Sequence, residues 1–154
     1  MGRNQESNTG RKFGVIAIAA LASAALFASA SAQADIKVGI VVSATGPAAS
    51  LGIPQKNTAA LLPKEIAGQK VEYIVLDDAS DTTTAVKDIK KLIDEEHVDV
   101  VIGPSTTPNA IAMTDPAVDS ETPVISMAAA AALISPMDAK KKWIFKTPQN
   151  DSLM

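Results

Sequence analysis

Residues 36–47, with the sequence IKVGIVVSATGP, join an apolar, β-branched segment directly to a turn that contains glycine and proline. Valine and isoleucine favour strands and a glycine–proline turn ends them, so residues 36–42 are predicted to form a β-strand. The same order recurs in VDVVIGP at 98–104, which predicts another strand over 98–102. Both segments are almost continuously apolar, which is typical of strands that are covered on both faces.

Segments with helical features lie between the predicted strands. A helix is expected from about residue 54 to residue 66, bent or broken at Pro63 and ended at Gly68. A strand follows over 71–76, and Asp81 then caps a second helix. The apolar residues of this helix recur at helical spacing, and they are Val86, Ile89, Leu92 and Ile93.

The second half of the chain continues the alternation. Thr107 is predicted as the N-cap, and Pro108 as the first residue, of a helix that runs to about Val118. Two further strands are predicted over 123–127 and 143–145. Strands that alternate with helices in this way predict an α/β fold, with a parallel sheet and helices on both of its faces.

The ligands of open parallel sheets bind beyond the carboxyl ends of the strands. The loops predicted there are rich in small residues and hydroxyl groups and have free backbone N–H groups, which suits a carboxylate or another anion at a helix N-terminus. After the strand predicted at 98–102, the candidate binding residues are Ser105, Thr106 and Thr107. The sequence leaves open whether these hydroxyls bind a ligand or only cap the following helix.

Three carboxylates, Asp77, Asp78 and Asp81, follow the strand predicted at 71–76 and are potential ligands of a divalent cation. Carboxylates in this position more often cap the next helix and accept hydrogen bonds from loop amides, so we expect a structural role. The chain has a single histidine, His97, and no cysteine, which excludes thiol catalysis and disulfides. The sequence therefore predicts no metal site, no cofactor and no catalytic group.

The first 34 residues have the organisation of a secretory signal peptide. Three basic residues precede an uncharged apolar segment at 13–30, and Ala32-Gln33-Ala34 forms a cleavage site of the small-x-small type. A retained membrane anchor fits less well, because the segment is shorter than the ~20 residues that span a bilayer and is diluted by alanine and serine. We predict cleavage after Ala34, a periplasmic location and no remaining membrane anchor.

Cleavage after Ala34 would remove three basic residues and one acidic residue. The remaining 120 residues carry 11 Lys and Arg against 16 Asp and Glu, a net charge of −5. Nucleic-acid binding needs a basic surface, so this acidic domain is not expected to bind nucleic acid.

Several motifs resemble those of a known family. Residues 45–52, TGPAASLG, are similar to the T/S-G-P-x-A-x-x-G loop of periplasmic solute-binding proteins of the branched-chain amino-acid (Leu/Ile/Val) type. Residues 77–81, DDASD, match the D-D-x-x-D stretch of that family. The resemblance extends over essentially all of 35–154. Three further segments fall in the family's order and spacing, namely 102–107, 123–126 and 145–147.

This resemblance implies a type I, two-lobed Venus-flytrap fold. Such proteins capture a small solute between their lobes and deliver it to the membrane permease of an ABC transporter. By comparison with the family, residues 35–147 correspond to an incomplete first lobe, and residues 148–154 to the start of the hinge that crosses to a second lobe. The implied function is that of the extracytoplasmic binding component of such a transporter, and not that of an enzyme.

The resemblance also implies roles for individual residues. The hydroxyl that receives the solute's carboxylate falls at Thr107, a backbone partner at Ala128, and an apolar contact at Leu51. Ala130 stands where the family tends to have a second carboxylate-binding threonine. The expected solute is a branched-chain or related amino acid, and the alternative is an aromatic carboxylic acid. A periplasmic enzyme on a flavodoxin-like fold is the alternative from a different class of protein.

Overall fold

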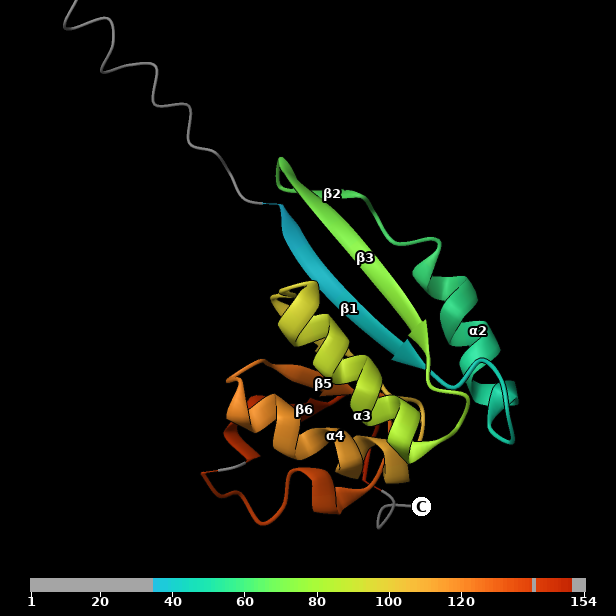
Figure 1. The fold of residues 1–154 in the computed structure, drawn as a ribbon, viewed down its shortest axis with the longest axis vertical. Coiled ribbons are helices and arrows are strands. Elements are labelled where there is room, and N and C mark those ends of the chain that lie inside the picture. Colours follow the sequence, from blue (N-terminus) through green and yellow to red (C-terminus); the bar gives the residue numbers. More distant parts are fainter. Residues whose placement is uncertain (1–34, 140, 151–154) are drawn as a thin grey trace, which may run out of the picture. The chain divides into compact units, whose positions relative to one another are not determined.

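A six-stranded sheet runs through the computed structural model, which describes residues 35–139 and 141–150 (Figure 1). The predicted signal peptide, residues 1–34, lies outside the described residues, and so do residues 151–154 of the predicted hinge segment. The strands follow the order β2-β3-β1-β4-β5-β6, and all neighbours are parallel except β2 and β3. The predicted parallel sheet is confirmed.

The five parallel strands are those that the sequence predicts, with small differences at their ends. Strand β4 begins two residues late, because the N–H of Val98 still bonds to the carbonyl of Leu92 in the preceding helix. Trp143 lies in a 3-10 turn before β6 and not in the strand itself. The strands are β1 (Ile36–Val42), β3 (Gln69–Asp77), β4 (Val100–Ile102), β5 (Val124–Ser126) and β6 (Ile144–Lys146).

The first helix differs from its prediction. Helix α2 spans Ala49–Ala59, so it begins earlier than expected and ends before Pro63. Glu65–Ile66, predicted as its last turn, form the short strand β2, which pairs antiparallel with β3. Ala67 and Gly68 between them have φ values of 52° and 81°. Two left-handed residues are what a tight hairpin requires, so Gly68 completes a hairpin turn instead of ending a helix.

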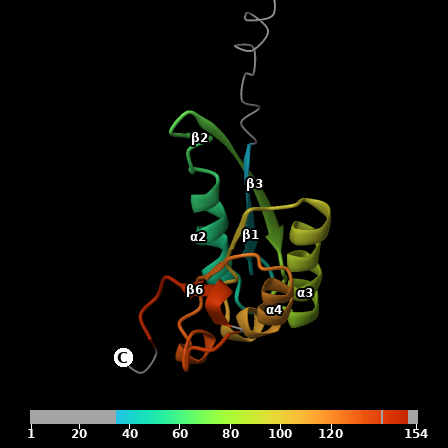
Figure 2. The same ribbon diagram turned by 90° about the vertical axis from the view of Figure 1, so that its left-hand side faces the viewer.

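Helices cover both faces of the sheet, as predicted (Figure 2). Helix α2 lies on one face, and α3 (Thr82–Lys90) and α4 (Thr107–Asp119) lie on the other. Alternate residues of β1 point into two cores. The core under α3 and α4 includes Val41, Ile89, Leu92, Val101 and Met113. The core under α2 includes Val38, Ile40, Val42, Ala59 and Val71.

The starts of α3 and α4 test the predicted helix caps. Asp81 caps α3, and its carboxylate accepts a hydrogen bond from the N–H of Thr84 at 2.7 Å, as predicted. The N-cap of α4 is Thr106 and not Thr107 as expected. Thr106 has extended φ and ψ of −120° and 150°, and its carbonyl accepts the helical bond from the N–H of Ala110, so Thr107 is already the first helical residue.

Three short helical segments complete the described chain. Helix α3 continues as the π-helical turn η1 (Lys91–Glu95), and the 3-10 turns η2 (Ala131–Leu133) and η3 (Lys141–Trp143) lie between β5 and β6. In the part of the chain that the structure describes, no helix has the length and apolar character needed to cross a bilayer.

Candidate functional site

The carboxyl ends of β1 and β4 mark the point where the chain reverses direction across the sheet. From β1 the chain passes through α2 to β3 on one side, and from β3 it returns through α3 to β4 on the other side of β1. The two connecting helices therefore cover opposite faces (Figure 2). Ligands of open α/β sheets bind at such reversal points, so the loops after β1 and β4 frame the candidate site.

Ser105 joins these two loops. Its hydroxyl accepts a hydrogen bond from the N–H of Ser43 at 3.0 Å and donates one to Oε1 of Gln55 in α2. Gly52 lies so close to Ser43 that a Cβ at this position would collide with the Ser43 carbonyl group. A hydroxyl has a single proton to donate. Ser105, predicted as a ligand-binding candidate, therefore cannot donate to a solute while it is bonded to Gln55.

Asp77 and Ser80 hold the same β1 loop from the side of β3. The Ser80 hydroxyl donates to the carbonyl of Thr45 at 2.7 Å and accepts from the N–H of Ala48 at 3.0 Å. Burial alone would raise the pKa of Asp77, but its hydrogen bonds outweigh that effect and lower the pKa below its ordinary value. Oδ1 of Asp77 accepts from three backbone N–H groups, those of Ala44, Thr45 and Ala79, at 2.9, 3.2 and 3.0 Å.

The other two carboxylates are also engaged within the protein. Asp78 is fully buried, with one oxygen bonded to the N–H of Ser80 at 2.8 Å and the other to Nδ2 of Asn109 at 2.7 Å. At Asp81, hydrogen bonds from the N–H and hydroxyl of Thr84 lower the pKa. The expected structural role of these carboxylates is confirmed. Across 35–139 and 141–150, no three or more His, Cys, Asp or Glu residues are grouped so that they could hold a metal ion.

The hydroxyls of Thr106 and Thr107 remain available at the first turn of α4. Both residues are half-buried, and neither hydroxyl bonds to any residue that the structure describes. The N–H groups of a first helical turn lack partners within the helix, and the helix dipole favours negative charge beside them. The start of α4 thus offers two free hydroxyls and backbone donors at the carboxyl edge of the sheet.

The loop after β5 lies beside the loop after β4, because the N–H of Met127 donates to the carbonyl of Pro104 at 3.3 Å. Ala128 is buried, and its N–H donates to the hydroxyl of Ser126 at 3.1 Å. A solute would have to displace this bond in order to use the Ala128 N–H. Ala130 is half-buried and directly precedes η2.

Leu51 reaches the same edge from α2. It is 52% exposed and lies four residues before Gln55, so the two side chains share one face of the helix. Gln55 bonds to Ser105, and that face is therefore turned toward the loop after β4. The structure thus places all six predicted residues at one edge of the sheet.

Three residues at this edge are absent from the sequence-based predictions. Gln55 and Asn109 are helix residues whose partners lie 50 and 31 positions away, and no local pattern marks such pairs. Lys146 ends β6, and its ammonium group donates to the carbonyls of Ala129 and Gln149. It lies within 145–147, one of the segments that match the family's spacing, but nothing in that match marked it as a binding residue.

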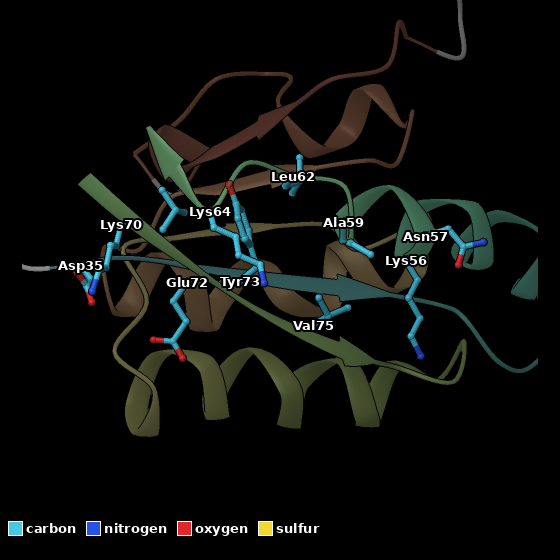
Figure 3. Close-up of a pocket in the computed structure, with 12 residues that line it drawn as sticks. Asp35, Lys56, Asn57, Ala59, Leu62, Lys64, Lys70, Glu72, Tyr73 and Val75 are labelled. Atoms are coloured by element: carbon cyan, nitrogen blue, oxygen red, sulfur yellow. The ribbon is translucent and has the colours of Figure 1, made fainter. Parts of the chain in front are cut away.

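A hollow of about 850 Å³ lies elsewhere, between the last turns of α2 and the face of β3 (Figure 3). Its lining includes apolar side chains such as Leu62 and Val75 and the lysines 56, 64 and 70. It is lined by the beginning and middle of β3, away from the carboxyl ends of the strands. The free hydroxyls of the candidate site are not among its lining residues, so we place the site at the carboxyl edge.

Comparisons with known proteins agree with this architecture. A family model described as periplasmic binding protein matches residues 35–153. An extracellular ligand-binding receptor from Rhodopseudomonas palustris HaA2 has 52% sequence identity and a TM-score of 0.77, over 79% of this chain and 34% of that one. A search of curated proteins gave no match.

Two other solved structures differ in the solutes they contain. A solute-binding protein of an ABC transporter from Rhodopseudomonas palustris BisB5, in complex with 3,4-dihydroxy benzoic acid, has 31% identity and a TM-score of 0.66, over 75% of this chain and 32% of that one. A branched-chain amino acid transporter substrate-binding protein from Streptococcus pneumoniae, in complex with isoleucine, has 24% identity and a TM-score of 0.68, over 77% and 35%. The latter likeness shows the fold alone. The chain spans about a third of the length of these proteins.

Proposed function

Because this chain belongs to the periplasmic binding protein family, as its motifs predicted, we propose that it contributes the first lobe of the solute-binding component of an ABC transporter. The proposed solute is a small molecule with a carboxylate group, which the protein delivers to a membrane permease. The proposed location is the periplasm, after removal of residues 1–34, and we propose no cofactor.

The observation that supports this proposal best is the pair of free hydroxyls at the start of α4. Thr106 and Thr107 lie at the reversal point of the sheet, where ligands of such folds bind. The neighbouring loop after β1 is held by hydrogen bonds to Ser105, Asp77 and Ser80. A hydrogen-bonded loop frame beside free donors is the arrangement expected of a binding site, since little loop ordering is needed when a ligand binds.

We propose an aromatic carboxylic acid as the solute in preference to a branched-chain amino acid. The similar protein that contains 3,4-dihydroxy benzoic acid shares 31% identity with this chain, against 24% for the protein that contains isoleucine. The site residues also favour an aromatic acid. Ala130 offers no hydroxyl, and Leu51 offers an aliphatic surface for the apolar part of the solute.

A thermal-shift screen of the full-length protein tests the proposal. Ligands that bind only the native state must raise its Tm, so 3,4-dihydroxybenzoate should raise the Tm more than leucine, isoleucine or valine. A protein whose Tm responds to none of these carboxylates would not have the proposed function. A response to the amino acids alone would support the transport function and reverse the choice of solute.

Calorimetry on point variants then tests the site. Thr107→Ala removes one charge-assisted hydrogen bond, worth about 1.5–3 kcal/mol or about 10- to 150-fold in Kd. Thr107→Ser keeps the hydroxyl and should bind nearly as well as the wild type. Thr114→Ala is the control, because its hydroxyl bonds only to the carbonyl of Ala110 within α4. Unchanged affinity in Thr107→Ala would move the carboxylate site elsewhere.

A gain-of-function variant tests the role of Ala130. If the missing hydroxyl disfavours amino acids, Ala130→Thr should increase affinity for leucine, isoleucine or valine. Loss of all binding without such a gain would show instead that the half-buried position tolerates no larger side chain.

A further inference from the structure

Lys146 is a cation without a counter-ion at the edge where the solute is proposed to bind. It is half-buried, and its ammonium group donates to two neutral acceptors, the carbonyls of Ala129 and Gln149. It forms no ion pair with any carboxylate in the described ranges. Hydrogen bonds to neutral carbonyls offset only part of the cost of burying a charge, and an opposite charge would offset more of it, so this position favours the arrival of an anion.

The register of the sheet places Lys146 on the same face and edge as the start of α4. Lys146 pairs with Ser126, so it stands level with the carboxyl end of β5. Residues two apart on a strand share a face, and Ile144 belongs to the core that α4 covers. Strand β6 also packs against α4. The ammonium group therefore lies on the side of the sheet on which Thr106 and Thr107 begin α4.

The bonds of Lys146 connect it to the predicted contact residues. Ala129, whose carbonyl it binds, stands between Ala128 and Ala130 in the loop after β5. An ammonium group has three N–H donors, and only two of them have acceptors among the described residues. The third donor is open to a ligand. Asp78, which bonds to Asn109 in α4, has a hydrogen bond within the protein on each of its carboxylate oxygens.

We infer that Lys146 is a specificity-determining residue of the proposed site, which supplies the counter-charge for the carboxylate of the solute. This inference rests on the proposed function and deepens it. A cation in this lobe favours solutes with a net negative charge, such as aromatic or other simple carboxylic acids. A zwitterionic amino acid gains less, because its own ammonium group offsets the attraction.

A purely structural role for Lys146 makes a different prediction. If the ammonium group only connects the loop at Ala129 to the segment at Gln149, replacing Lys146 would weaken the binding of charged and neutral solutes alike. If the ammonium group acts as a counter-charge, replacing Lys146 would selectively weaken the binding of the anion. The ratio of the Kd of a neutral analogue to the Kd of its acid separates these two roles.

The test measures this ratio for 3,4-dihydroxybenzoate and its neutral amide, 3,4-dihydroxybenzamide, by calorimetry on the full-length protein. In Lys146→Gln the Kd of the acid should rise about 10-fold or more, and that of the amide should change less than about 3-fold. Lys146→Arg keeps the charge and should keep the preference for the acid. Lys142→Gln is the matched control, because it removes the same charge from an exposed lysine that pairs with Glu121 on the surface.

The outcomes distinguish this inference from the proposed function. A wild-type protein that binds the acid, with a Lys146→Gln variant that weakens acid and amide equally, would overturn the inference and leave the transport function standing. An equal loss of preference in Lys142→Gln would also overturn it, by showing a general effect of net charge. If the wild-type protein bound neither compound, the proposal of an aromatic solute would be wrong, and so would this inference.

Discussion

The Ser105 hydroxyl accepts a hydrogen bond from the N–H of Ser43 at 3.0 Å, and this bond crosses from the loop after β4 to the loop after β1. Both residues are buried, with exposures of 6% and 0%. The same hydroxyl donates to Gln55, so three separate segments meet at one oxygen atom. The geometry of the candidate site therefore depends on a residue that need not touch the solute.

Ser105→Ala should destabilise the protein more than an ordinary surface substitution does. It leaves the buried N–H of Ser43 without an acceptor, and an unsatisfied buried donor costs about 1–3 kcal/mol. Urea unfolding of the full-length protein measures this loss in the free energy of unfolding. Ser135→Ala, at an exposed serine, should change it by less than about 0.5 kcal/mol. Equal effects of the two variants would contradict the bracing role of Ser105.

Gly52→Ala should destabilise the protein even though alanine is the better helix former. Glycine in a helix interior normally costs about 1 kcal/mol relative to alanine. At Gly52, however, an added Cβ would collide with the carbonyl group of Ser43. Overpacking of this kind costs about 1–3 kcal/mol. Ser50→Ala, at an exposed position of the same helix, is the control and should be neutral or slightly stabilising. Stabilisation by Gly52→Ala, measured from the thermal melt, would show that α2 can move away from Ser43.

The strands and their order in the sequence could be predicted because their patterns are local. A segment rich in valine and isoleucine marks β1, and Asp81 marks the start of α3. Helix α2 was misplaced because its start has no such mark: its N-cap is Ala48, which makes no side-chain cap. The hairpin at Gly68 was missed because a glycine after a helical segment resembles a helix end as much as a turn.

The candidate site could be predicted only in part, for a related reason. Motif positions and the rule for parallel sheets predicted that Thr107 and Ala128 lie at the carboxyl edge of the sheet, and the structure has them there. The contacts that brace this edge join residues far apart in the chain, such as Asp78 with Asn109 and Ser43 with Ser105. Their partners are chosen by packing, which no local spacing reveals. The role of Lys146 was not predicted, although 145–147 matched the family's spacing, because its acceptors are backbone carbonyls that leave no trace in the sequence.

Export should remove the first 34 residues, so that the mature protein begins at Asp35. The prediction rests on Ala32 and Ala34, the small residues that the cleavage site requires. The intact mass of exported protein checks it. Ala34→Tyr should retain the leader, whereas Gln33→Tyr, at the intervening position, should be processed normally. Retention of the leader in the exported wild-type protein would contradict a cleavable signal.

Asp88 in α3 carries an electrostatic cost that depends on pH. One of its carboxylate oxygens is buried without a hydrogen-bond partner in the described ranges. Burial first, and then the negative charges of Asp78 and Asp77, raise the pKa of Asp88 to about 6 from its ordinary value of 3.8. The folded protein therefore holds this proton to a higher pH than the unfolded chain does. The contribution of Asp88 to the free energy of unfolding is therefore fully present below about pH 4, and it is lost as the pH rises to about 6.

Asp88→Asn should consequently stabilise the full-length protein at pH 7 and have little effect near pH 4. Because the side chain is only partly buried, solvent screening limits the gain to about 0.5–1 kcal/mol. Urea unfolding at pH 4, 5, 6 and 7 measures the difference between variant and wild type, which should grow across this range and then level off. Asp94→Asn, an exposed carboxylate on the next turn, is the control for the loss of one negative charge. A gain that is independent of pH, or that the control variant shares, would mean that the carboxyl group of Asp88 is solvated in the folded protein.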